Sequence, residues 1–229
     1  MDDTLYSASA GMFHDIHVLM DAYIVERLGL TPEQANELRK YYWRKYGVTY
    51  YGLWLHHGID PHDFLTATHK VDTSSIHTQG RMREAIMSLK GQRILFTNAP
   101  NSFVDQVLER LNLSSCFVDQ YRAEDMKVFG HWRPKPSAKM LKNVLACHHV
   151  KPHECCLVDD NLNNLKVAKT VGIQTVLCKG WHHHGLEVIR PIPYVDAFIS
   201  HIRDIKKILV SPTPKKQKHR RPIFLNPYN

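Results

Sequence analysis

The sequence predicts a doubly wound α/β fold with a helical insertion near its start. From about residue 91 onward, short apolar runs alternate with helical patterns, and such alternation implies parallel strands joined by crossover helices. From about residue 12 to 90, by contrast, the pattern is helical throughout. The chain has 229 residues and 43% apolar composition, which is enough for one core domain and a smaller inserted domain.

The helical stretch carries the signals of at least three helices. The segment "GMFHDIHVLMDAYIVERLGL" repeats apolar residues close to every 3.6 positions, which predicts an amphipathic helix. In "TPEQ", Thr31 is a candidate N-cap, Pro32 suits the first helical position, and Gln34 completes a capping box. The segment "DPHD", which begins at Asp60, repeats this logic, so a further helix is expected there.

The second half of the chain supplies the core elements in alternation. Strands are expected at "RILFTNA", "CFVDQY", "ECCLVDD" and "IQTVLC", and helices at "SFVDQVLERLNL", "PSAKMLKNVLACHH" and "NLNNLKVAKTVG". Gly172 closes the last of these helices. We therefore expect an α/β core at 1–8 and 89–204, a helical insertion at 9–88, and a separate tail at 205–229.

The net charge of +8 is concentrated in that tail. Residues 205–229 hold seven of the 30 Lys and Arg residues and no acid, which leaves 23 basic against 22 acidic residues elsewhere. Its proline and lysine content predicts a flexible appendage rather than an RNA-binding or membrane-surface arm. We expect no membrane partner, and a nucleic-acid partner only if the tail binds one.

Targeting signals and cysteine usage favour a cytoplasmic protein. No apolar run approaches the roughly 18 to 20 residues of a membrane span, and the first residues lack the pattern of a signal peptide. The five cysteines show no CxxC spacing and lie mostly in apolar surroundings, so we expect reduced thiols and no structural zinc.

Polar residues that follow the expected strands are the candidates for chemistry. In an open parallel sheet the ligand lies beyond the carboxyl ends of the strands. The residues found there, or at the start of the chain, are Asp2, Asp3, Thr4, Thr97, Asn98, Lys135, Asp159 and Asp160. Each alone could be a helix cap, a turn residue or a solvated charge. Together, carboxylates, a hydroxyl and a lysine at one sheet edge suit a metal-assisted phosphate site.

The order of these segments resembles a known family. "DDTLY", "ILFTNAP", "RPKPSAK" and "CLVDDNLNNLKVAKTVG" look like the four motifs of the haloacid dehalogenase-like hydrolase superfamily, whose first motif is Asp-x-Asp-x-Thr/Val. This resemblance implies a three-layer, Rossmann-like parallel sheet with a helical-bundle cap. The insertion is similar to the cap of pyrimidine 5′-nucleotidase-type members. Most of its aromatic residues are expected to pack in the core of this cap, with Tyr46 or His57 as a candidate for facing a nucleobase.

The resemblance also implies a mechanism. The first Asp of motif one attacks phosphorus and forms an aspartyl-phosphate, while the second, matched by Asp2, protonates the leaving oxygen and then activates water. Mg²⁺ is held by the nucleophile, the backbone carbonyl of Asp2, Asp160 and, directly or through water, Asp159. Asn164 orders the loop that carries both acids.

Phosphate binding is assigned to the other two motifs. Thr97 and the backbone N–H of Asn98 match the groups that bind phosphoryl oxygens, and Lys135 matches the lysine that offsets their charge. The implied function is Mg²⁺-dependent hydrolysis of a small phosphate monoester, with a pyrimidine nucleoside 5′-monophosphate as the leading substrate. The alternatives are a sugar-phosphate phosphatase or phosphomutase, and a binding protein that lacks the nucleophile.

One departure from the family pattern concerns the nucleophile. Aligning "MDDTLY" with motif one places Met1 on the variable residue, so the attacking Asp would precede Met1. A shifted register would put Thr4 in the acid/base position, and we reject it. We expect that Met1 is an internal methionine and that an apolar central strand ending in Asp lies upstream. The alternative is a truncated gene with an inactive product.

Overall fold

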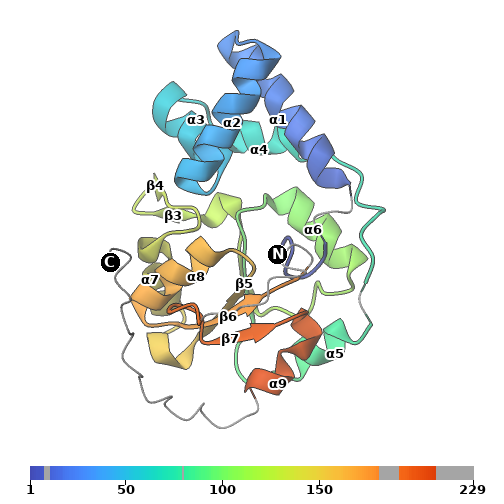
Figure 1. Ribbon diagram of the computed structural model, residues 1–229, viewed down its shortest axis with the longest axis vertical. Helices are drawn as coiled ribbons and strands as arrows, with labels where there is room; N and C mark the ends of the chain where they lie inside the picture. Colours follow the sequence, from blue (N-terminus) through green and yellow to red (C-terminus); the bar gives the residue numbers. More distant parts are fainter. Residues whose placement is uncertain (8–10, 79, 181–190, 210–229) are drawn as a thin grey trace, which may run out of the picture.

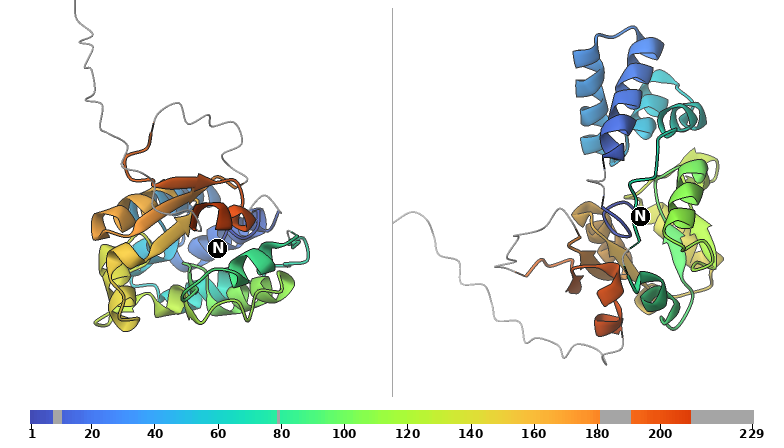
Figure 2. Two further views of the ribbon diagram at one scale, coloured as in Figure 1. Left: turned by 90° about the horizontal axis from the view of Figure 1, so that it is seen from below. Right: turned by 90° about the vertical axis from the view of Figure 1, so that its right-hand side faces the viewer.

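A computed structural model describes residues 1–7, 11–78, 80–180 and 191–209. Of the tail expected at 205–229, these ranges include only residues 205–209, where Ile205 is buried and residues 206–209 form a short helix. The helices of the N-terminal part of the chain gather at one end of the molecule, and the parallel strands with their helices form the other end (Figures 1 and 2). No described helix combines the length and the apolar character that crossing a membrane requires.

The helical body consists of α1 (Met12–Leu28), α2 (Pro32–Tyr46), α3 (Thr49–His57) and α4 (Pro61–Thr68). The expected caps are confirmed. The Thr31 Oγ1 atom accepts from the Gln34 N–H at 3.3 Å, and the Gln34 side chain accepts from the Thr31 N–H at 2.9 Å. Asp60 accepts from the His62 N–H at 3.0 Å. No separate pattern in the sequence predicted α3.

The helical body has its own apolar cluster. Ile24, Leu53 and Phe64 are fully buried at its centre. A hairpin of β3 (Lys127–Val128) and β4 (His131–Trp132), which the sequence did not predict, adds Trp132 to this cluster. The Trp132 ring packs edge-on against Tyr50, 6.0 Å between centroids.

The α/β body contains parallel strands, as expected. Strand β1 (Ile94–Phe96) pairs with β2 (Asp119–Tyr121), and β5 (Cys156–Asp159) pairs with β6 (Gln174–Cys178), which pairs in turn with β7 (Ala197–Ile199). The remaining elements are α5 (Met82–Met87), α6 (Asn101–Arg110), α7 (Ala138–Cys147), α8 (Leu162–Val171), α9 (Lys206–Leu209) and the 3₁₀ turns Ala123–Asp125, Pro152–Glu154 and Ile202–Asp204. Strand β7 and α5 had no strong sequence pattern because each is short.

The described parallel strands form two separate sheets, β1–β2 and β5–β6–β7. The first residues of the chain lie inside the α/β body (Figures 1 and 2). Met1, Leu5 and Tyr6 are buried in the same apolar cluster as Leu95 of β1 and Val176 of β6. The "MDDTLY" segment is therefore held at the centre of the α/β body by apolar contacts with both sheets.

Candidate active site

Asp159 lies at the carboxyl end of β5 and is 4% exposed. Its Oδ2 atom accepts from the Lys135 ammonium at 2.9 Å. Its Oδ1 atom accepts from the Asn164 amide at 2.8 Å and from the Asn161 N–H at 2.9 Å. Burial alone would raise the pKa of Asp159, but the Lys135 charge and these hydrogen bonds lower it, so the carboxylate stays ionised.

Lys135 is held in place by Asn98, which follows β1. The Asn98 Oδ1 atom accepts from the Lys135 N–H at 2.8 Å, and the Asn98 Nδ2 group donates to the Lys135 carbonyl at 3.0 Å. Burial would lower the pKa of Lys135, yet Asp159, Asp160 and Asp2 raise it, so the side chain stays charged. An amide side chain thereby joins the loop after β1 to the loop before α7.

Asp160 and the motif-one segment face each other. The Thr4 hydroxyl donates to Asp160 Oδ1 at 3.0 Å, and the Tyr6 hydroxyl donates to Asp2 Oδ1. Burial and the adjacent Asp159 charge raise the pKa of Asp160 to about 6. A carboxyl group whose ionisation is opposed in this way would be stabilised by a further cation.

Thr97 follows β1 and is 2% exposed. Its N–H donates to the Tyr121 carbonyl at 2.9 Å, which continues the β1–β2 ladder by one residue. Its Oγ1 atom accepts from the Ala99 N–H at 3.2 Å. Among the described residues the Thr97 hydroxyl proton has no acceptor, so the hydroxyl can donate to a bound oxyanion.

The six residues to which the family resemblance assigns catalysis, phosphate binding or metal binding line one cavity of about 650 Å³ between the two bodies. They are Asp2, Thr97, Asn98, Lys135, Asp159 and Asp160. The helical body contributes further lining residues, among them Arg39, Lys40 and His69. Sequence reasoning missed Arg39 because α2 carries several basic residues and nothing in the pattern marks the one that turns inward.

The expectation that Tyr46 or His57 faces this cavity was wrong. Neither lines it. The Tyr46 hydroxyl lies 2.6 Å from His56 Nε2, and His57 Nε2 lies 2.8 Å from the Tyr42 hydroxyl. These aromatic and imidazole groups of α2 and α3 satisfy one another.

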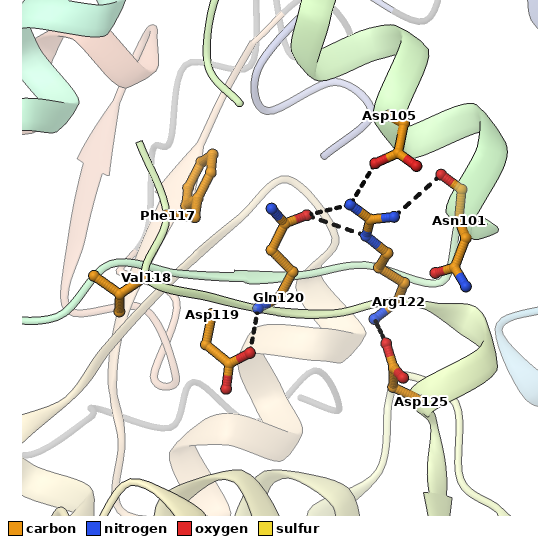
Figure 3. A pocket seen from close by; sticks show the side chains of 8 residues that line it. All are labelled: Asn101, Asp105, Phe117, Val118, Asp119, Gln120, Arg122 and Asp125. Atoms are coloured by element: carbon orange, nitrogen blue, oxygen red, sulfur yellow. Dashed lines mark hydrogen bonds and ion pairs between the residues drawn. The ribbon is translucent and has the colours of Figure 1, made fainter. Parts of the chain in front are cut away.

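A second hollow, of about 500 Å³, surrounds Arg122 near β2 (Figure 3) and shares no lining residue with the first. The Arg122 guanidinium donates to Asp105 at 2.6 Å and to Gln120 at 2.8 and 3.1 Å, and Asn101 supplies a carbonyl at 3.3 Å. None of the six residues above lines this hollow. Its arginine already has its acceptors, so it does not compete as the candidate active site.

The chemistry of the first cavity's donors fits a hard cation. Its described lining contains four carboxylates, Asp2, Asp3, Asp159 and Asp160, with Lys135 as the ammonium among them. Oxygen donors of this kind suit Mg²⁺. In the described ranges, no three or more His, Cys, Asp or Glu side chains are already grouped as a metal site, so backbone or other oxygens would have to complete the coordination.

Comparison with known proteins identifies the family. A model of the haloacid dehalogenase-like hydrolase family matches residues 1–172, which is most of the chain. The chain belongs to this family. The family resemblance of the four motifs is thereby confirmed, whereas the comparison does not reach the nucleotidase subtype.

Two curated relatives are bacterial phosphoglycolate phosphatases. The protein from Vibrio parahaemolyticus is 32% identical over 91 residues, or 40% of this chain and 38% of the relative. That from Vibrio vulnificus is 28% identical over 118 residues, or 51% of this chain and 49% of the relative. The aligned part of this chain thus spans half or less of the relatives' length.

Solved structures share the fold at low identity. A HAD phosphatase from Thermococcus onnurineus superposes with a TM-score of 0.56 and 17% identity, covering 91% of this chain and 94% of the other. The L-2-haloacid dehalogenase from Xanthobacter autotrophicus gives a TM-score of 0.55 and 14% identity, covering 92% and 96%. These similarities confirm the doubly wound α/β architecture.

Proposed function

We propose that the protein hydrolyses a small phosphate monoester, with Mg²⁺, through an aspartyl-phosphate. The observation that carries this proposal is the buried Lys135–Asp159 pair, 2.9 Å apart, in one cavity with Asp160, Thr97 and Asp2. A fixed ammonium and a hydroxyl donor beside acidic oxygen ligands suit a phosphoryl group and its counter-cation.

Each residue has a role in this proposal. Lys135, the Thr97 hydroxyl and the Asn98 N–H bind the phosphoryl oxygens and offset the charge that develops on them. Asp2 gives a proton to the leaving oxygen and then takes one from the attacking water. The Tyr6 hydroxyl, which donates to Asp2, holds that carboxylate in one orientation.

Mg²⁺ would be held by Asp160, the backbone carbonyl of Asp2 and, directly or through water, Asp159. When bound, it supplies positive charge to the phosphoryl oxygens. Asp159 already accepts from Lys135, Asn161 and Asn164, so its contribution to the ion is mainly charge. Asp160 is the better candidate for direct coordination.

The nucleophile belongs to the same proposal. The family pattern puts it two residues before Asp2, at the end of an apolar strand that would join the β1–β2 and β5–β6–β7 sheets.

For the substrate, the relatives favour the alternative over the pyrimidine nucleotide. Their name, phosphoglycolate phosphatase, is nearer to a small non-nucleotide organic phosphate than to a nucleoside monophosphate. We therefore rank small organic phosphates first. A cytoplasmic location and the absence of a nucleic-acid partner stay predictions of the sequence.

A substrate panel tests the function as a whole. The native protein would be assayed for phosphate release from phosphoglycolate, sugar phosphates, UMP and CMP, with Mg²⁺ and with a chelator. We expect Mg²⁺-dependent release, highest for non-nucleotide substrates. A preference for UMP or CMP would restore the nucleotidase reading, and binding without release would favour the non-enzymatic one.

A further inference from the structure

Arg39 is a buried cationic side chain on the helical wall of the cavity. It lies on α2, is 8% exposed, and lines the same cavity as Lys135 and Asp159. A guanidinium is rarely buried without partners, because its hydration is lost on burial. The partners it has, and those it lacks, therefore indicate its role.

Asp21 of α1 occupies one edge of the guanidinium. The Arg39 Nε group donates to Asp21 Oδ1 at 2.6 Å, and Nη2 lies 3.5 Å from Asp21 Oδ2. The Asn36 amide donates to the same Oδ2 at 2.8 Å, which fixes the carboxylate. A guanidinium has five N–H donors, and within the described ranges the Nη1 group has no acceptor.

The charges of the cavity are segregated. Its four lining carboxylates, Asp2, Asp3, Asp159 and Asp160, all belong to the α/β wall, whereas the charged residues of the helical wall are Arg39 and Lys40. The nearby imidazoles add no fixed positive charge: burial lowers the pKa of His69 to about 4, and partial burial with the Arg39 charge lowers that of His17. The helical wall is thus suited to an anion that is not the phosphoryl group.

We propose that Arg39 binds a second anionic group of the substrate, so that the preferred ligand is a phosphate monoester that also carries a carboxylate or a second phosphate. This inference rests on the proposed phosphatase function and narrows its substrate class. Asp21 acts as a positioning residue, since it holds the Nε–Nη2 edge of the guanidinium and accepts no hydrogen bond from Nη1. A pyrimidine nucleoside 5′-monophosphate has no such second anion.

The test compares kcat/KM of the native protein for two substrates that differ in one group. Phosphoglycolate carries a carboxylate where ethyl phosphate carries a methyl group. We expect phosphoglycolate to be favoured about 10- to 100-fold, the range of a hydrogen-bonded charge pair. Arg39→Gln should bring this ratio close to one through a higher KM for phosphoglycolate, and Arg39→Lys should keep part of it.

The matched control is Arg44→Gln, which removes an exposed arginine from the same helix and should keep the ratio. A merely structural role of Arg39 would lower both rates together and leave the ratio unchanged, which would overturn the inference. An equal rate for both substrates in the native protein would also overturn it, without any variant having to fold. If neither substrate is hydrolysed, and neither raises the melting temperature, the proposed function fails first and the inference fails with it.

Discussion

The two walls of the cavity hold their charges in different ways. On the α/β wall, Asp159 ends β5 and Lys135 lies on the loop before α7, and each is fixed by several hydrogen bonds from neighbouring segments. On the helical wall, Arg39 is fixed by the single carboxylate of Asp21. Strand ends that meet at one sheet edge bring residues from distant parts of the chain together. The position of a side chain on a helix depends instead on how that helix packs against its neighbours.

The largest effect is expected for Lys135→Met, which removes the ammonium of the α/β wall. It leaves Asp159 as a buried carboxylate without its counter-charge, and breaking such a pair costs about 3–5 kcal/mol. We also expect kcat/KM to fall by about 10²- to 10³-fold. Urea unfolding and phosphate-release assays measure both.

Lys139→Met is its control, because Lys139 is exposed and lies nearby in the first turn of α7. Equal unfolding free energies for the two variants would mean that the Lys135–Asp159 pair contributes nothing net to stability.

A pH effect is expected where α4 meets the α/β body. The His69 ring packs on Phe103, and burial lowers the pKa of His69 from 6.5 to about 4. Below pH 6.5, His69 takes up a proton in the unfolded chain but stays neutral in the folded chain. The stability that depends on neutral His69 is therefore fully present above pH 6.5 and is lost as pH falls to about 4. The loss is at most about 3 kcal/mol.

Urea unfolding at a series of pH values between 4 and 7 gives the slope of the unfolding free energy against pH. His69→Gln should flatten this slope, and His62→Gln, at an exposed position of α4, should not. Identical slopes in all three proteins would refute the assignment to His69.

Stabilisation by Mg²⁺ is expected to depend on the α/β wall and not on the helical body. At a hundredfold excess over Kd, a cation bound only by the folded protein stabilises it by about 2.7 kcal/mol, or roughly 5 to 10 °C in Tm for a chain of this size. Asp160→Asn, on the α/β wall, should remove most of this shift. Asp15→Asn, at an exposed position of α1, should keep it, and thermal melts in which both variants respond alike would exclude Asp160 as a ligand.

The smallest effect concerns the point where the walls touch. Gly47 ends α2, and a Cβ atom there would lie 2.8 Å from Pro136 Cδ and 2.9 Å from the Lys135 carbonyl. Gly29 ends α1 in the same left-handed conformation with no atom within 4 Å. Both Ala variants share a backbone cost of about 1–2 kcal/mol. Gly47→Ala should therefore be less stable than Gly29→Ala and should raise KM. Equal losses of unfolding free energy in the two variants would show that Pro136 and Lys135 move aside without cost.

Sequence reasoning predicted the α/β wall better than the helical wall. Residues that end strands could be placed together because parallel strands share one edge, and the caps at Thr31 and Asp60 are local signals that tertiary packing did not override. Arg39 could not be found, since the inward face of α2 depends on how it packs against α1. Tyr46 and His57 were misplaced because α2 and α3 provide each with a partner on the other helix.

The link between Asn98 and Lys135 has a consequence for how this family member tolerates change. The Asn98 side chain donates to one peptide group and accepts from the same residue, so it recognises the main chain at position 135 and not the lysine side chain. Aspartate has nearly the same shape, but an ionised carboxylate has no donor. Its oxygen would therefore repel the Lys135 carbonyl, which now accepts from the Asn98 Nδ2 group. Asn98→Asp, the substitution that changes the shape of residue 98 least, is therefore among the least tolerable there. At position 135, by contrast, a different side chain leaves the main chain held in place by Asn98.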